Sequence, residues 1–181
     1  MSLEPNGIQV CRLSAASQKS ICDHFQRLDL TSRWARFCGA ISDEDVLKYA
    51  QNIFRHNAVV CGALVEGQLR GVVELRGLFQ SWPSTAEAAF SVEPDWQNIG
   101  IGDALFERMF AMARNRGVRT IQMICLKENS RMRHLAAKHD AQLHYDQDAT
   151  EAILRPFWPT PASLMEEIVG ETRSYAHRLF E

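Results

Sequence analysis

The feature that most constrains the fold of this chain is a strand, a helix and a second strand in close succession between residues 86 and 126. Residues 102–116 carry apolar side chains at helical spacing, and Gly117 follows where a left-handed helix end belongs. The apolar run 86–92 before this helix predicts a strand. The run 120–126 after it is interrupted only by Gln122, which predicts a strand buried on both faces. Two strands joined through one helix predict a parallel pair.

Caps, turns and periodicity predict the remaining elements of an α/β (α+β) domain. In chain order they are a strand over 8–13, a helix from the cap Ser14 to about Leu28, an irregular packed loop over 30–41, a helix capped by Ser42, a hairpin over 58–76 with its turn at Gly67, a helix from Asn129 to about Lys138, and strands over 141–145 and 151–154.

We predict one domain over residues 1–155 and a C-terminal helical extension over 156–181. Thr160 and Pro161 form a cap with proline at the first helical position. An apolar stripe follows at Leu164, Ile168, Thr172, Tyr175 and Leu179. Such a stripe is expected to pack either back on the domain or on a partner chain, which would make a homodimer.

Composition limits the partners and the cellular location. The 181 residues carry a formal net charge of -2 with a pI near 6.3, which predicts binding to neither nucleic acid nor an anionic membrane. No apolar run is long enough to span a membrane. Five cysteines with no CxxC pair suggest reduced thiols in a cytoplasmic protein. The spacing of the histidines predicts no metal site.

The loop before the central helix has the chemistry of a phosphate site. A helix N-terminus offers unpaired N–H groups and a partial positive charge, so a diphosphate can bind there without a basic side chain. Glycines at 100 and 102 would let the phosphate oxygens approach the backbone. Leu105 stands where a Rossmann fingerprint needs a small residue, and the Gly-Lys-Ser/Thr of a P-loop is absent.

The same region resembles the core motif of the GNAT superfamily of N-acetyltransferases, whose loop has the form Gln/Arg-x-x-Gly-x-Gly/Ala. The matching residues are Gln97-Asn98-Ile99-Gly100-Ile101-Gly102 after the strand 86–92, and Leu126 to Asn129 resembles the family's Asn-headed helix. The resemblance covers about 150 residues. It implies the GNAT fold, with a central mixed, mostly antiparallel sheet of six to seven strands, a splayed parallel pair and flanking helices.

The resemblance also implies an enzyme that transfers acetyl from acetyl-CoA directly to a primary amine. Glu87 would be the general base, with Glu74 in reserve, and the Val92 N–H would stabilise the oxyanion. The implied cofactor-binding residues are Phe90, Val92, Gln97, Asn98, Ile99, Gly100, Ile101, Gly102, Asp103 and Asn129. Many family members have a tyrosine seven residues after that asparagine as the acid, but here the residue is Ala136, so the acid stays unassigned.

The acceptor amine stays open between two classes. The stretch Ser32 to Phe37, the Ala-Glu start of the motif strand and the helix after Asn129 are similar to bacterial Pat-type protein lysine acetyltransferases. A small-molecule amine, such as a polyamine, aminoglycoside or amino acid, fits the same core, because acceptor specificity lies in variable loops. A third possibility is a non-catalytic acyl-CoA-binding module.

Overall fold

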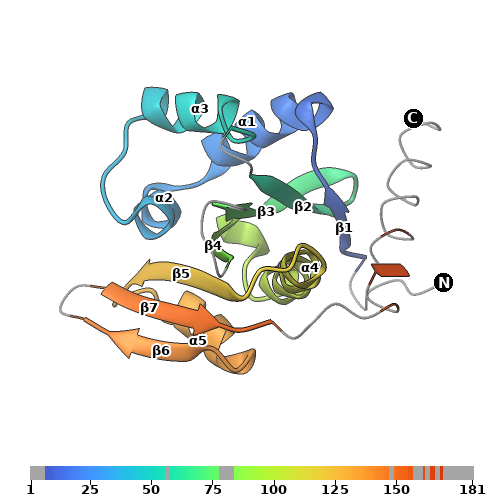
Figure 1. Ribbon diagram of the computed structural model, residues 1–181. Helices are drawn as coiled ribbons and strands as arrows, with labels where there is room; N and C mark the ends of the chain where they lie inside the picture. The colour runs from blue at the N-terminus through green and yellow to red at the C-terminus, as the bar shows by residue number, and fades with distance from the viewer. Residues whose placement is uncertain are drawn as a thin grey trace.

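The computed structural model describes residues 7–55, 58–77, 84–146 and 149–156, together with positions 161, 164, 165 and 168. Figure 1 shows a central sheet with helices on both sides. The strands are β1 (Gln9–Arg12), β2 (Val59–Val65), β3 (Gln68–Arg76), β4 (Thr85–Val92), β5 (Thr120–Leu126), β6 (Gln142–Tyr145) and β7 (Ala149–Leu154). The helices are α1 (Gln18–Arg27), α2 (Leu30–Phe37), α3 (Asp43–Gln51), α4 (Ile101–Asn115) and α5 (Ser130–Lys138), with short 3-10 turns at Ala15–Ser17 and Pro94–Trp96.

The seven strands form one sheet in the order β1-β2-β3-β4-β5-β7-β6. Every neighbouring pair is antiparallel except β4 and β5, which are parallel. That parallel pairing extends over only three residues of each strand, from Thr85 to Glu87 on β4. The predicted mixed sheet and the splayed parallel pair are therefore confirmed.

Two cores hold the helices on opposite faces of the sheet. On one face α4 packs Leu105, Phe106 and Met109 onto the strands, and α5 joins this core through Ala136. On the other face Phe25 of α1 and Val46 of α3 lie in a second core. Odd-numbered residues of β4 face the α1 and α2 side, since the even-numbered Ala86 and Ala88 belong to the α4 core. Even-numbered side chains of β4 therefore contact the α4 layer, and odd-numbered ones point toward the layer of α1 and α2.

The prediction of an irregular loop over 30–41 is wrong. Residues 30–37 form α2, with Asp29 as N-cap accepting from the Ser32 amide and Cys38 ending the helix in the left-handed conformation. Hydrophobic periodicity does not predict this helix, because several of its apolar side chains face solvent and its arginines face the interior. Leu30 and Trp34 are exposed, whereas Arg33 is buried and Arg36 turns inward to an ion pair.

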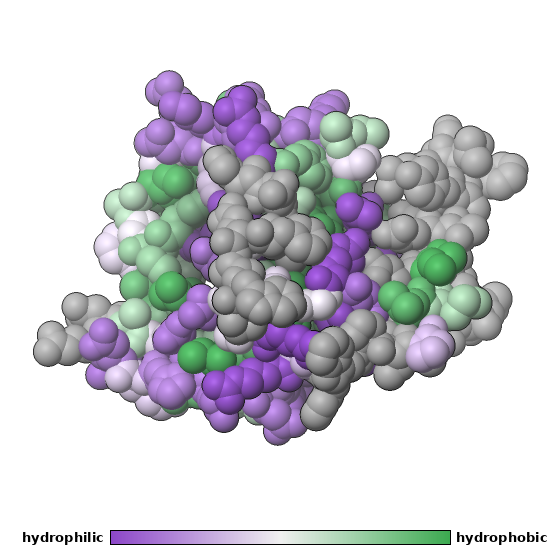
Figure 2. All heavy atoms as spheres, in the orientation of Figure 1, coloured by the Kyte–Doolittle hydropathy of each residue, from purple (hydrophilic) through white to green (hydrophobic). Residues whose placement is uncertain are grey.

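The prediction that β5 is buried on both faces is also wrong. Its residues alternate in burial, and Ile124 is 59% exposed on the face opposite α4. Within the described residues, α2 is the helix that packs against β5 on this face, whereas α1 packs on β3 and α3 packs on α1. Figure 2 shows hydrophobic surface on the side of the molecule where α2 and β5 lie.

The predicted C-terminal extension lies largely outside the described residues, and its packing and any homodimer stay predictions. The four described positions after residue 156 are helical, and Leu164, Met165 and Ile168 are exposed. Among the described residues, no helix is long and apolar enough to cross a membrane.

Candidate active site

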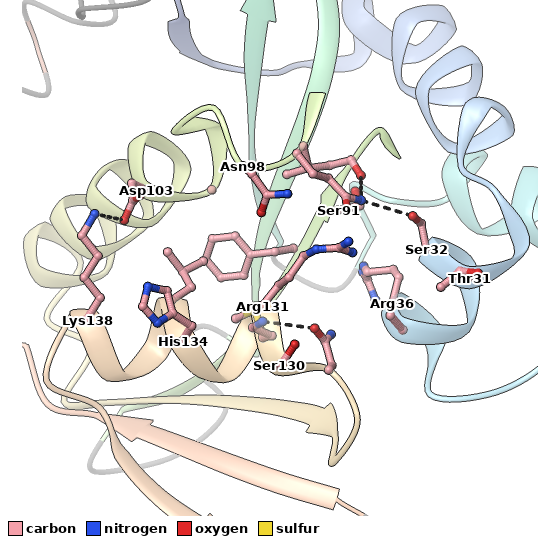
Figure 3. A pocket seen from close by; sticks show the side chains of 18 of the residues that line it. Thr31, Ser32, Arg36, Ser91, Asn98, Asp103, Ser130, Arg131, His134 and Lys138 are labelled. Carbon is pink, nitrogen blue, oxygen red and sulfur yellow. Dashed lines mark hydrogen bonds and ion pairs between the residues drawn. The ribbon is translucent and has the colours of Figure 1, made fainter. Parts of the chain in front are cut away.

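A cavity of about 630 Å³ opens where β4 and β5 separate. Its walls come from α2, the end of β4, the loop into α4 and the first turns of α5. Figure 3 shows Asn98 and Asp103 on the α4 side, Ser130, Arg131 and His134 on α5, and Ser32 and Arg36 on α2. Eight residues of the predicted site line this cavity: Phe90, Val92, Gln97, Asn98, Gly100, Gly102, Asp103 and Asn129.

The start of α4 presents a set of unpaired amides to this cavity. The N–H groups of Asn98, Gly100, Ile101, Gly102 and Asp103 have no hydrogen-bond partner within the described part of the chain. The first internal bond of the turn runs from the Ala104 amide to the Gly100 carbonyl, at 3.0 Å. The helix end therefore keeps the donors and the partial positive charge that bind a diphosphate. Ile101 contributes only its backbone, because its side chain is buried in the core.

The backbone conformation of the loop before α4 sets the direction of these N–H groups. Gly100 has φ +98 and Asn98 has φ 63, so two residues of the loop have a left-handed backbone conformation before the helix begins. A left-handed φ is readily available to glycine and tolerated by asparagine. A side chain at Gly102 would meet only Leu135 of α5, at 3.5 Å. A glycine at position 102 therefore keeps the cavity accessible, and the backbone conformation there does not require one.

The edge of β4 beside the loop is free of strand pairing. The Glu93 amide donates to the Arg70 carbonyl of β3 at 2.9 Å, so antiparallel alternation turns the N–H and C=O of Val92 away from β3 and toward β5. Among the described residues, no strand pairs with this edge of β4 beyond Glu87. The Val92 carbonyl accepts from Gln97 Nε2 at 3.0 Å, and its N–H faces the gap. Gln97 thus braces the loop against β4.

The α5 wall carries positive charge next to the helix start. Lys138 Nζ lies 2.8 Å from the Asp103 carboxylate, and His139 Nε2 lies 3.2 Å from the same oxygen. Burial would raise the pKa of Asp103, but hydrogen bonds from Lys138 and His139 outweigh it and lower that pKa. Asn129 caps α5, because its Oδ1 accepts from the Met132 amide at 3.1 Å. Its Oδ1 therefore has a structural role in addition to its predicted contact with the cofactor.

The sequence matches the Acetyltransferase (GNAT) family over residues 27–141, more than half of the chain. The chain belongs to the GNAT family. It is an acyltransferase, and acetyl-CoA is its co-substrate. No curated protein matches the sequence.

Solved structures share the GNAT fold at low sequence identity. The GNAT domain of Streptomyces lividans PAT has a TM-score of 0.69 at 19% identity, covering 81% of this chain and 89% of that one. A Salmonella typhimurium protein solved with acetyl-CoA has a TM-score of 0.65 at 16% identity, covering 84% and 95%. The Vibrio cholerae spermidine N-acetyltransferase, solved with CoA and spermine, has a TM-score of 0.67 at 16% identity, covering 82% and 95%.

In this GNAT enzyme the two predicted carboxylates occupy different environments. Glu87 is exposed on β4, at the last residue that pairs with β5, and it does not line the cavity. Glu74 is 1% exposed, and its oxygens are bonded by Arg36, Tyr49 and Arg76 at 2.5 to 2.9 Å. Two guanidinium groups and a hydroxyl therefore hold Glu74 in place, so it anchors α2 and α3 to β3.

The structure also brings together a polar group that the sequence did not reveal. His24 of α1 is fully buried, with Nε2 at 2.9 Å from Ser91 Oγ and Nδ1 at 3.1 Å from Glu93 Oε1. Arg27 and Arg70 also bond Glu93. Ser91 and Glu93 are two residues apart and point to the same side of the strand, a spacing that could have indicated that the two act together. Their common partner His24 lies 67 residues before Ser91, so no local pattern indicates it.

This buried group predicts acid sensitivity. Burial lowers the pKa of His24 below 6.5, so the unfolded chain takes up a proton that the folded protein does not. The contribution of neutral His24 to the free energy of unfolding is fully present above pH 6.5. Below pH 6.5 the free energy of unfolding falls by up to about 1.4 kcal/mol per pH unit. Burial would raise the pKa of Glu93, but bonds from His24, Arg27 and Arg70 lower it to about 2, so further stability is lost between pH 4.5 and 2.

Urea denaturation at a series of pH values measures this effect. The His24→Gln variant should show a flat free energy of unfolding between pH 6.5 and 5, where wild type declines. Equal slopes in the two proteins would contradict the assignment.

Proposed function

We propose that acetyl-CoA binds in the cavity between β4 and α5 and that this enzyme transfers its acetyl group to a primary amine of a protein lysine. The unpaired amides at the start of α4 carry the proposal, because they converge on one end of the cavity that the splay opens. Asn98, Gly100, Ile101, Gly102 and Asp103 would bind the pyrophosphate. The Val92 N–H would polarise the thioester carbonyl.

The positive side chains of α5 would meet the remaining phosphate of the cofactor. Arg131, His134 and Lys138 line the cavity beyond the helix start. A cation makes charge-assisted hydrogen bonds to a phosphate, and Lys138 can exchange its Asp103 contact for one. Phe90 and Asn129 would flank the pantetheine arm between these two ends.

Glu87 would receive the proton that the amine loses. A lysine amine with a pKa near 10.4 is protonated at pH 7 and must be deprotonated before attack. Glu87 shares its strand face with Ser91, and four residues of extended strand separate the two by roughly 13 Å. The proton would therefore reach Glu87 through intervening water rather than by direct contact.

Exposed apolar side chains on α2 and β5 favour a polypeptide acceptor. Ile124 of β5 is 59% exposed on the face of the sheet that Glu87 shares, and Trp34 is 52% exposed on α2, which packs against β4 and β5. These side chains suit the apolar neighbours of a lysine in a polypeptide, whereas a small polyamine gains little from them. The solved neighbours include an enzyme of a small polyamine, so fold likeness does not choose between the two classes.

An acceptor screen tests the proposal. Lysine peptides with apolar neighbours should be acetylated with higher kcat/KM than spermidine, aminoglycosides or free amino acids. The Trp34→Ala variant should lose about 10-fold in kcat/KM for such peptides, as expected for truncating one aromatic contact, and keep its affinity for CoA. Transfer confined to small amines, unchanged in Trp34→Ala, would overturn the lysine assignment.

A further inference from the structure

A chain of hydrogen bonds connects the cavity to a buried histidine. Ser91 Oγ lies 2.9 Å from His24 Nε2, and His24 Nδ1 lies 3.1 Å from Glu93 Oε1. All three residues are at most 7% exposed, and Ser91 is the member of the group that lines the cavity. Hydrogen bonds that are already formed between such groups can carry a proton from the cavity to the histidine and back.

The charges around Glu93 fix the tautomer of His24. Arg27 Nε and Arg70 Nη1 each donate to Glu93 at 2.9 Å, so the carboxylate is ionised and can only accept. His24 must then donate from Nδ1. A neutral imidazole has one N–H, so Nε2 carries the lone pair, and the Ser91 hydroxyl donates to it. Among the described residues no group donates to Ser91 Oγ, so its lone pairs are left to accept from a ligand.

Ser91 Oγ lies where an attacking amine would need an acceptor. The Val92 nitrogen is bonded to the Ser91 carbonyl carbon, so covalent geometry keeps Oγ close to the N–H that faces the gap between β4 and β5. Figure 3 shows Ser91 on the same side of the cavity as Ser32 and Arg36 of α2. A thioester carbonyl polarised by the Val92 N–H would therefore have its carbon beside an oxygen that can accept from the amine.

The charges at this end of the cavity favour a neutral amine over an ammonium ion. Asp103 is the carboxylate among the described residues that line the cavity, and Lys138 and His139 already bond it. Arg36 lies on the α2 wall, toward which the side chain of Ser91 points. An amine that has already lost one proton would therefore bind here more favourably than its charged form.

The reaction then has a second proton to move. A neutral amine becomes positively charged when it attacks the carbonyl carbon, and this proton must leave before the amide forms. The CoA thiol has a pKa of about 8.5, so the departing thiolate takes up a proton at pH 7. Ala136 stands at the position of the usual acid and cannot supply it. One group that takes the proton from nitrogen and gives one to sulfur would serve both needs.

We propose that Ser91 is a catalytic residue that accepts the second proton of the attacking amine and delivers a proton to the CoA thiolate, with His24 holding the proton between the two transfers. His24 acts through Ser91 and is a positioning residue, and Glu93 orients it. The proposal rests on the proposed function, in which Glu87 receives the first proton of the amine. The acetyl group still passes directly from CoA to the amine.

The proton transfers balance without a further reactant. The amine nitrogen bonds to the carbonyl carbon, its proton moves to Ser91 Oγ, and the proton of Ser91 moves to His24 Nε2. The carbon–sulfur bond breaks, and Ser91 Oγ gives a proton to the thiolate as His24 returns one to Ser91. The amide and CoA leave, and both side chains are restored. Burial lowers the pKa of His24, so its cationic form is a strong enough acid to return the proton.

A purely structural role for Ser91 makes a different prediction. Its hydrogen bond joins β4 to α1, so Ser91→Ala would lower the free energy of unfolding by leaving His24 Nε2 without a donor. A structural role does not change how many protons move in the chemical step. The dependence of the rate on the deuterium content of the solvent therefore separates the two explanations.

The experiment measures single-turnover acetyl transfer from saturating acetyl-CoA to the best amine of the acceptor screen, in mixtures of H2O and D2O. The wild-type rate should fall with deuterium content along a curve, because more than one proton moves. Ser91→Ala should transfer acetyl about 100-fold more slowly, with a straight line and an unchanged Kd for CoA. Ser91→Thr, which keeps the hydroxyl, should restore both the rate and the curve. Ser84→Ala, which replaces another buried serine next to β4, is the matched control and should behave as wild type.

A folded Ser91→Ala protein whose rate is within about 3-fold of wild type, or whose rate has the same dependence on deuterium content, would overturn the proposal. In that case wild type still acetylates the amine, and the proposed transferase function stands. If wild type binds CoA but acetylates no amine, the proposed function fails, and the role of Ser91 fails with it.

Discussion

Replacing Gly102 by aspartate is expected to weaken CoA binding about 100-fold, or about 2.7 kcal/mol, while the protein stays folded. The new carboxylate would occupy the first turn of α4, where the unpaired amides and the partial positive charge would otherwise bind the pyrophosphate. It would repel the phosphates as well as block them. Isothermal titration calorimetry with CoA measures the change.

Stability should survive this substitution. Gly102 has an ordinary helical backbone, and an added Cβ meets only Leu135 at 3.5 Å. An acidic residue in the first turn of a helix is favourable by about 0.3–1 kcal/mol. Gly39→Asp, a surface glycine with open space around it, is the control with the same change of charge. A Kd within about 3-fold of wild type for Gly102→Asp would contradict the placement of the pyrophosphate.

The Glu87→Gln variant is expected to lower kcat for amine acetylation by about 100- to 1000-fold, since general base catalysis contributes about that much. Glutamine keeps the shape of the side chain but accepts no proton at neutral pH. The KM for acetyl-CoA should stay unchanged, because Glu87 does not line the cavity. Thiol release in the presence of a saturating amine measures the rate.

A matched carboxylate on the same sheet separates catalysis from general electrostatics. Glu151 of β7 pairs with Ile124, so it lies on the sheet face that Glu87 shares. Glu151→Gln should retain wild-type kcat. A loss of equal size in both variants, or a Glu87→Gln rate within about 3-fold of wild type, would remove Glu87 from the mechanism.

Local sequence signals were sufficient to predict the turn and helix caps around the candidate site. Gly100 and Gly102 between an apolar strand and an amphipathic helix predicted the turn, and Asn129 predicted the cap of α5, because these features depend on residues close in the chain. Asn98 is the non-glycine residue of this loop with a left-handed conformation, and asparagine is a residue type that tolerates it.

Features built from distant residues escaped prediction. The α2 helix escaped because Arg36 is inside, and its partner Glu74 lies 38 residues away. The exposed side of β5 depends on where α2 ends, which no local pattern contains. The contact between His24 and Ser91 joins two elements that only the folded sheet brings together. Ion pairs and buried histidines reverse the usual hydropathy of a position, so such sites are the first to be missed.

The binding of the diphosphate by main-chain amides is the claim on which the others depend, and NMR titration of the labelled protein with CoA tests it directly. We expect the largest changes in amide proton shift, toward lower field, at Asn98, Gly100, Ile101, Gly102 and Asp103, because each would gain a charged acceptor. If CoA binds while these five amides keep their shifts and a different group of residues responds, the cofactor site lies elsewhere in the molecule.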